Sequence, residues 1–430
     1  MTPFPSLHLW RAEGLRLRRQ PLAWIALGAL LTVLLAASTW AGLEARAWRT
    51  AEAAHHTRQV ALLAAAIAQV RHGPPPGPAA AAATYQLGRG DLGVTRMPVG
   101  DGLALGVQRL AVLPHGLKAS LDSRHVDARS TTPLRNPWLL AIGLPGLPAV
   151  VALVLPLVAL VLCAGLPQEE REQGRLGLLR LQARAGLVRL LGAALGWRLL
   201  ALVAVAMLGT LPALLLDPGT GLAASLQWFA ALAVFCATWV MLGGLLCWVP
   251  FSGAAALLSA LGLWLVLTFA VPAGLVWHAQ REAPMPSRLA AIVAIRQAQQ
   301  HSDVNEAELA RAWYARHPGV AAPLPAAWPA SVIPRVLAQE QALRPLMHRF
   351  DDARARQAAV VQRWAWLSPG LALVLHGDRL AGTDTASHLR YLRDVEAFES
   401  RWREFLAPHV MDLQGIPAQR LQALPRFGPP

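Results

Sequence analysis

The stretch from Asp217 to Arg281 constrains the fold of this chain most, because no Asp, Glu, Lys or Arg lies between those two residues. A helix needs about 20 mostly apolar residues to cross about 30 Å of hydrocarbon, so the stretch is long enough for two crossings. Pro250-Phe251-Ser252-Gly253 interrupts it, and proline and glycine favour turns. We therefore predict a helical hairpin with spans at 225–249 and 254–277 and a short inner turn at 250–253.

Three further uncharged runs are each long enough to cross a membrane. Only 15% of the residues are charged, against roughly a quarter in soluble domains, and 55% are hydrophobic. The apolar core of the first run is longer than the roughly 7–15 residues of a signal peptide, so we interpret it as an uncleaved anchor. The prediction is an all-α polytopic membrane protein whose five transmembrane helices lie at 21–43, 137–166, 194–216, 225–249 and 254–277.

Basic residues in short loops indicate the orientation, since such loops stay in the cytoplasm. The tail 1–20 holds four Arg and one Glu, for +3, and the loop 167–193 holds five Arg and three Glu, for +2. The short loop 217–224 carries only Asp217, as expected outside. The N-terminus is therefore predicted to be cytoplasmic, and the long segments 44–136 and 278–430, with the C-terminus, to be extracytoplasmic.

The two long segments differ in composition. Residues 44–72 lack Gly and Pro and should continue the first span as a helix, which the proline-rich linker 73–78 ends. Residues 84–136 suggest a small irregular or β-containing lobe. The C-terminal segment is predicted to be a helical domain, with helices at 287–316, 335–366 and 385–407, a proline-rich stretch at 317–334 and a turn near 377–384. The uncharged run 364–377 is too short to cross.

Motifs for enzymatic chemistry are missing. The sole lysine, Lys118, does not lie in a Walker-A phosphate loop, so any ATPase has to come from a partner chain. The net charge of +14 is spread over both sides of the membrane, which disfavours nucleic-acid binding. His55-His56 and His125-x-Asp127 fit exposed polar positions better than a metal site. Ser368-Pro369 is interpreted as a helix start rather than as part of a catalytic triad with His376.

The predicted spans carry no ionisable residue in their interiors, which disfavours an ion-coupled carrier. The most distinctive cytoplasmic element begins with Glu169, Glu170 and Glu172, which we expect to open a helix because carboxylates suit its N-terminal dipole. Composition alone favours an interfacial amphipathic helix over a docking element.

A resemblance to a family rests on two blocks. Asn136-Pro137, Gly143 and Pro156-Leu157, leading into Glu170-x-Glu172-x-Gly174-x-Leu176 and Leu178-Leu179, resemble the permease subunits of type-2 ABC exporters. The subgroup with two large extracytoplasmic inserts, related to gliding-motility and copper-enzyme-maturation permeases, is the most similar. The second block comprises Ser368, Pro369, Ala381, Gly382, Thr383, Asp384, His388 and the late Leu424-Pro425-Arg426-Phe427.

The resemblance implies a protein of the bacterial cytoplasmic (inner) membrane that pairs with a second permease, identical or different, and with ABC ATP-binding subunits. ATP and Mg would be bound by those subunits and not by this chain. The coupling residues would be Glu169, Glu170, Glu172, Gly174, Leu176, Leu178 and Leu179, and Ser368, Pro369 and 381–384 would be family-motif residues of the exported domain.

The sequence departs from the family pattern in three places that matter. Arg175 stands where the family commonly has Thr, and Gly143-Leu-Pro-Gly-Leu-Pro148 stands where the family has an acidic residue after the glycine that starts the second span. A sixth span is usual after the Leu-Pro-Arg-Phe block, whereas this chain stops at Pro430. Three alternatives therefore stay open besides the exporter permease. They are a truncated inactive permease copy, a membrane-anchored structural or assembly factor whose exported domains bind proteins, and an enzyme acting at the outer face.

Overall fold

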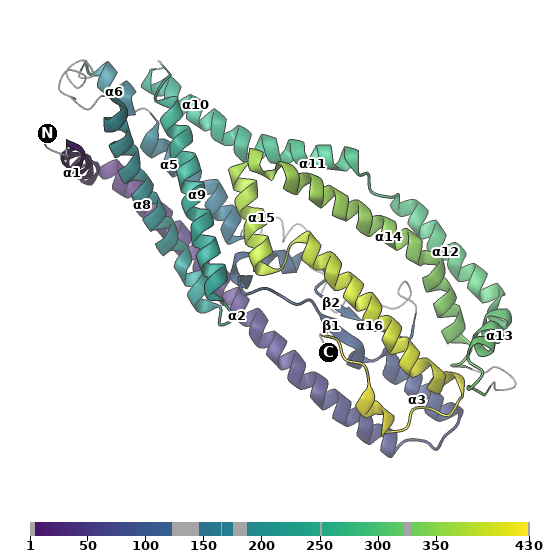
Figure 1. Ribbon diagram of the computed structural model, residues 1–430. Helices are drawn as coiled ribbons and strands as arrows, with labels where there is room; N and C mark the ends of the chain where they lie inside the picture. The colour runs from purple at the N-terminus through teal and green to yellow at the C-terminus, as the bar shows by residue number, and fades with distance from the viewer. Residues whose placement is uncertain are drawn as a thin grey trace.

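A single 51-residue helix, α2 (Pro21–Arg71), runs the length of the molecule in the computed structural model (Figure 1). The structure describes residues 5–122, 146–164, 166–174, 187–249, 252–321 and 328–428. At 1.5 Å per residue α2 is about 77 Å long, more than twice the hydrocarbon thickness of a bilayer. Its first half is apolar and its second half carries the charged residues of 44–71, so the first predicted span continues as a helix through the charged residues that follow it, as predicted.

Among the described residues, four helices are long and apolar enough to cross a membrane: α2, α8 (Leu187–Leu216), α9 (Leu222–Leu246) and the continuous helix Gly253–Glu282. The last comprises α10 (Gly253–Leu265), a π-helical turn η4 (Val266–Ala270) and α11 (Val271–Glu282). A fifth apolar helix, α5 (Leu147–Cys163), is shorter and lies within the predicted span 137–166, of which residues 137–145 are outside the described residues. The prediction of a mostly helical multi-span membrane protein is confirmed.

Small residues let the spans approach closely. A Cβ on Gly209 of α8 would lie 2.6 Å from the Cβ of Leu34 on α2, and one on Gly42 would lie 2.8 Å from that of Leu216. Ser38 of α2 donates a hydrogen bond to the Gly209 carbonyl over 2.7 Å. Such small-residue contacts drive helix association where lipid removes the hydrophobic driving force.

The extramembrane part of the first insert is short and mixed. It contains α3 (Pro78–Arg89), three 3-10 turns, η1 (Asp91–Gly93), η2 (Leu103–Leu105) and η3 (Val107–Ala111), and two short strands. The strands, β1 (Val94–Arg96) and β2 (Gly116–Lys118), pair antiparallel with Val94 opposite Lys118. This hairpin is a local departure from an all-α fold and agrees with the β-containing lobe expected there; residues 123–136 lie outside the described residues.

The C-terminal segment is helical. It contains α12 (Arg288–Val304), α13 (Glu306–Arg316), α14 (Val332–Trp364), η5 (Ala365–Leu367), α15 (Pro369–Ala381), α16 (Thr385–Met411) and η6 (Arg420–Ala423). Two details of the prediction were wrong. The helix expected over 287–316 is interrupted at Asn305, and Gly377 lies inside α15 instead of in a turn, because α15 extends to the left-handed Gly382.

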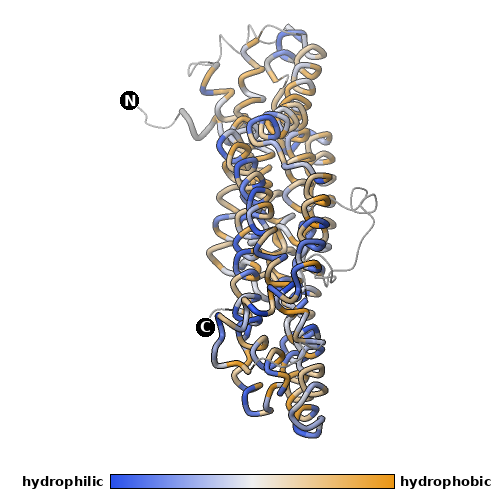
Figure 2. The backbone as a smooth tube through the Cα atoms, turned by 90° about the vertical axis from the view of Figure 1, so that its right-hand side faces the viewer, coloured by the Kyte–Doolittle hydropathy of each residue, from blue (hydrophilic) through white to orange (hydrophobic). Residues whose placement is uncertain are grey.

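Both inserts build one body, which the sequence did not indicate. Its core joins Ala81 and Tyr85 of α3 to Phe398 and Trp402 of α16. The Trp402 indole donates to the Gly88 carbonyl over 3.0 Å, and the Tyr391 hydroxyl accepts from the Leu117 backbone N–H over 3.1 Å. Hydrophilic residues become frequent toward this end of the molecule, away from the N-terminus (Figure 2).

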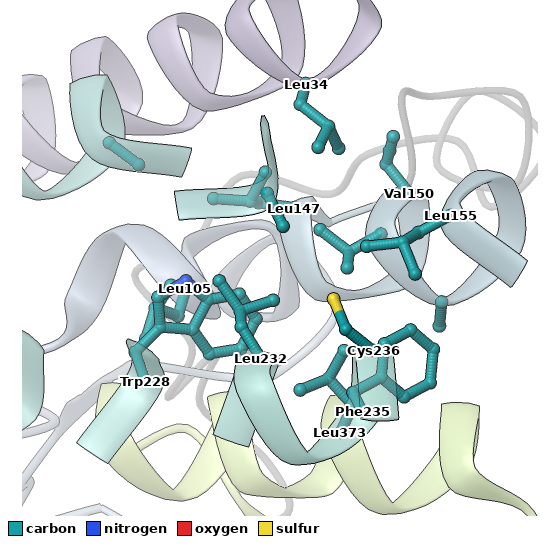
Figure 3. Packing of buried hydrophobic residues seen from close by; sticks show 14 of the residues in the cluster. Leu34, Leu105, Leu147, Val150, Leu155, Trp228, Leu232, Phe235, Cys236 and Leu373 are labelled. Carbon is teal, nitrogen blue, oxygen red and sulfur yellow. The ribbon is translucent and has the colours of Figure 1, made fainter. Parts of the chain in front are cut away.

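Helix α15 connects this body to the spans. Leu373 of α15 points toward Leu232, Phe235 and Cys236 of α9 in a core that also contains α2 and α5 residues (Figure 3). A Cβ on Gly377 would lie 2.6 Å from Pro148 of α5. The uncharged run 364–377 therefore packs along the outside of α5 and α9, which explains its apolar character without a membrane crossing.

Candidate functional site

The described coupling residues, Glu170, Glu172 and Gly174, lie at the end of the bundle that carries α1 (Pro5–Arg18), α6 (Leu166–Glu172) and the start of α10 (Figure 1). Helix α6 follows α5 almost directly, and Gly174 just beyond it has a positive φ of 68° that favours glycine. Leu176, Leu178 and Leu179 lie outside the described residues, as does the side chain of Glu169. The expected helix opening on the carboxylates was wrong: α6 begins at Leu166, so Glu170 and Glu172 fall in its last turn.

Each of three α6 side chains contacts a different helix. Glu170 forms an ion pair with Arg16 of α1. Glu172 accepts a hydrogen bond from the Gly253 backbone N–H over 2.8 Å, at the first residue of α10, where helix N–H groups lack intrahelical partners. The buried Gln168 amide donates to the Leu246 and Val249 carbonyls, over 3.3 and 3.2 Å, at the end of α9.

The same end holds a buried arginine. Arg198 was placed at the start of the third span, but α8 begins at Leu187, so Arg198 lies within the helix and is only 2% exposed. Its guanidinium donates to the Leu162 carbonyl over 2.7 Å, in the last turn of α5, and to the Ala194 carbonyl over 3.0 Å. The cation stabilises the C-terminus of α5, where the Leu162 carbonyl has no intrahelical partner.

Aromatic packing attaches α1 to α8 at this level. The rings of Trp10 and Trp197 are 5.8 Å apart, and the Trp197 indole donates to the Trp10 carbonyl over 2.7 Å. A Cβ on Gly14 or on Gly196 would come within about 3 Å of these rings (3.0 and 2.7 Å), so the glycines make room for the tryptophans. We call the assembly of α1, α6 and the facing ends of α5, α8, α9 and α10 the basal platform.

The second block of predicted residues lies away from the basal platform, mainly at the two ends of α15, whose Ser368 end reaches the middle of the span Gly253–Glu282. Ser368 is fully buried; its hydroxyl accepts from the Leu371 N–H over 3.2 Å as an N-cap and donates to the Leu267 carbonyl over 2.7 Å. Leu267 lies in the π-helical turn η4 of the span Gly253–Glu282. Pro369 occupies the first helical turn, as predicted from Ser368-Pro369.

Residues 381–384 form the turn between α15 and α16. Gly382 has a φ of 68° and ends α15, and the Thr383 N–H donates to the Asp378 carbonyl over 2.9 Å. Asp384 caps α16 by accepting from the Ala386 N–H over 3.1 Å. The Gly100 N–H donates to the Ala381 carbonyl over 2.8 Å, and a Cβ on Gly100 would lie 2.4 Å from the Leu380 carbonyl oxygen. The block thus fastens the C-terminal segment to the first insert.

An ion pair extends this contact to the spans. Arg49 of α2 pairs with Asp217 after α8, and its guanidinium also donates to the Gly100 carbonyl over 3.0 Å. The Asp217 side chain has no exposed surface, and its carboxylate also accepts from the Gly219 N–H over 3.0 Å. We call the two ion pairs that join the first insert, α15 and the spans, Arg49–Asp217 and Arg109–Asp378, the junction. The sequence analysis noted Asp217 only as the single charge of a short outer loop.

A second ion pair of the junction joins Arg109 to Asp378, and Thr385 lies beside it, 3.4 Å from the guanidinium. Burial raises the pKa of the Asp378 carboxyl, and the adjacent Arg109 guanidinium opposes that rise. Nearby His388 is buried, and burial, with the charges of Arg354 and Arg109, lowers its pKa to about 4. The imidazole is therefore neutral near pH 7.

The described residues contain no group of three or more His, Cys, Asp or Glu side chains that could hold a metal ion. Within them the three cysteines, Cys163, Cys236 and Cys247, are buried and form no disulfide.

The fold and both ends of the bundle define a multi-pass helical membrane protein with a large extramembrane body. Residues 288–429, which begin at the start of α12, match the model of a family described as a domain of unknown function, DUF3526. The second block of predicted residues falls inside this match. No curated protein and no solved structure matches the chain. The protein is thus a multi-pass membrane protein that carries a DUF3526 domain.

Proposed function

We propose that this chain is the permease subunit of an ATP-driven type-2 ABC export complex, in which a separate subunit binds ATP and Mg. The observation that carries the proposal is the position of α6, which is fixed to α1 by Glu170, to α9 by Gln168 and to α10 by Glu172. A displacement of this short helix is passed to three helices at once. Such rigid-body transmission is how domain closure moves attached elements.

The far end of the molecule supports the same proposal. Span motions reach the extramembrane body through rigid contacts, since Arg49 and Ser368 bind it to α2 and to the span Gly253–Glu282. The proposed orientation puts the basal platform in the cytoplasm, where an ATPase is available, and the DUF3526 domain outside. In that arrangement a second permease subunit completes the transport path in the bilayer.

Charge reversal on α6 tests the proposal. Glu170→Arg places two guanidiniums together at α1, and Glu172→Arg removes the acceptor of the Gly253 N–H and puts a cation at a helix N-terminus. We expect each variant to insert normally and to lower ATP-dependent transport by about five- to 150-fold, the range of a 1–3 kcal/mol coupling energy. ATPase-driven export by membrane vesicles would be the measurement.

Glu308→Arg is the matched control, because Glu308 is an exposed carboxylate on α13 in the extramembrane body. It should leave transport unchanged. Unaltered transport by both α6 variants would contradict a coupling role for this helix.

A further inference from the structure

A cavity of about 680 Å³ lies between the span helix α11 and the helices α14 and α16 of the extramembrane body. Its volume falls within the range of small-molecule sites, about 300–1,000 Å³. Most of its wall is apolar, from Val276, Val361, Leu375, Leu389 and Leu392. The turn after η3 closes one side with Val112, Leu113 and Pro114.

The cavity lies where a span leaves the bilayer. Val276, Ala279 and Gln280 line it from the last two turns of the membrane-crossing helix. Between them in sequence, Trp277 is half exposed, and the Arg281 guanidinium lies 4.0 Å from the centre of its ring. Exposed Trp with Arg is typical of the membrane–water interface. A lipid of the adjoining leaflet therefore has direct access to the protein at the level of the cavity.

His388 is one of the polar residues that line the cavity. The side chain is 7% exposed, and its Nδ1 atom has no hydrogen-bond partner among the described residues. Within the family-motif block Gly382 and Asp384 serve as helix caps, whereas the His388 ring faces this cavity. A buried polar atom without a partner is costly, so a ligand that supplies the bond is favoured.

The charges around the cavity are balanced. Arg109 pairs with Asp378 and Arg354 with Asp351, and the Asp384 carboxylate is bound to the start of α16. The remaining polar lining consists of the amides of Gln280, Gln357 and Gln362, with the Thr385 hydroxyl. Amides and a neutral imidazole bind uncharged hydroxyl or amide groups, acting both as donors and as acceptors.

We infer that this cavity binds a membrane amphiphile with an uncharged, hydrogen-bonding head group, whose head contacts His388 and the glutamines and whose chain lies against the apolar wall. The site is separate from the basal platform and binds its ligand directly, so the inference does not depend on an ATPase partner.

A photoreactive monoacylglycerol tests it. The purified full-length protein in lipid nanodiscs would be irradiated with a diazirine-bearing monoacylglycerol, and adducts would be mapped by peptide mass spectrometry. We expect adducts in the peptides covering 354–362 and 384–392. Unlabelled monoolein should compete for these adducts, and oleate, which carries an anionic head, should compete at least tenfold less well.

Two neighbouring alanines of α14 give a matched pair of variants. Ala358 lines the cavity, whereas Ala359 is exposed outside it. Ala358→Trp fills the cavity and should reduce the adducts at least tenfold, while Ala359→Trp should leave them unchanged. His388→Leu, which keeps a buried apolar side chain, should reduce them and His388→Gln should retain part of them.

Equal labelling of the Ala358→Trp and Ala359→Trp variants would overturn the inference, as would adducts confined to the spans. Stronger competition by oleate than by monoolein would overturn the assignment of an uncharged head group. Retention of labelling in His388→Leu would overturn the role given to the imidazole.

Discussion

Arg49→Ala is expected to destabilise the protein by about 3–5 kcal/mol, because it leaves the Asp217 carboxylate buried without its cation. The substitution also removes the bond to the Gly100 carbonyl, so α2, the loop after α8 and the first insert lose a shared contact. The measurement is equilibrium unfolding of the purified protein in mixed micelles.

Arg46→Ala is the matched control, since Arg46 lies one turn earlier on α2 and is exposed. It should change the free energy of unfolding by less than about 0.5 kcal/mol, as surface substitutions do. Equal stability of the Arg49→Ala and Arg46→Ala variants would show that the junction does not hold the body on the spans.

Arg198→Met is expected to cost about 1.5–3 kcal/mol, the value of a hydrogen bond to a charged group. Methionine keeps much of the apolar stem but cannot donate to the Leu162 carbonyl, which lies in the last turn of α5. The C-terminal end of α5 then lacks both a donor and a favourable charge.

The same unfolding measurement applies, with Arg189→Met as control, because Arg189 is exposed on the same helix. Arg198→Lys should recover part of the loss, since lysine restores the charge but not the guanidinium geometry. A stability for Arg198→Met equal to that of Arg189→Met would contradict the capping role.

The spans were predictable because hydrocarbon requires long uncharged runs, and the run 217–281 admits only one arrangement into two helices. The helix start at Ser368-Pro369 was predictable for a similarly local reason, since serine caps and proline fits the first turn. The helices of the C-terminal segment also follow from local composition, whereas α3 lies largely where an irregular or β-containing lobe was expected.

The contacts at both ends of the bundle were not predictable, because they join residues far apart in the chain. Arg49 and Asp217 are 168 positions apart, and Ser368 meets Leu267 across 101. The three carboxylates of 169–172 were interpreted as the start of a helix, but Glu172 accepts a hydrogen bond at the start of α10, 81 positions later. Sequence alone indicates that charged residues at these positions are unusual. Only the fold identifies the residues that they contact.

The most direct test of the proposed permease is to identify what binds the basal platform. An affinity-tagged full-length protein would be extracted in a gentle detergent, and co-purifying proteins would be identified by mass spectrometry. The proposal predicts a phosphate-loop ATPase in stoichiometric amount, lost when Glu170 and Glu172 are both changed to Arg. Recovery of envelope proteins alone, with no ATPase, would contradict it and would favour a membrane-anchored assembly factor.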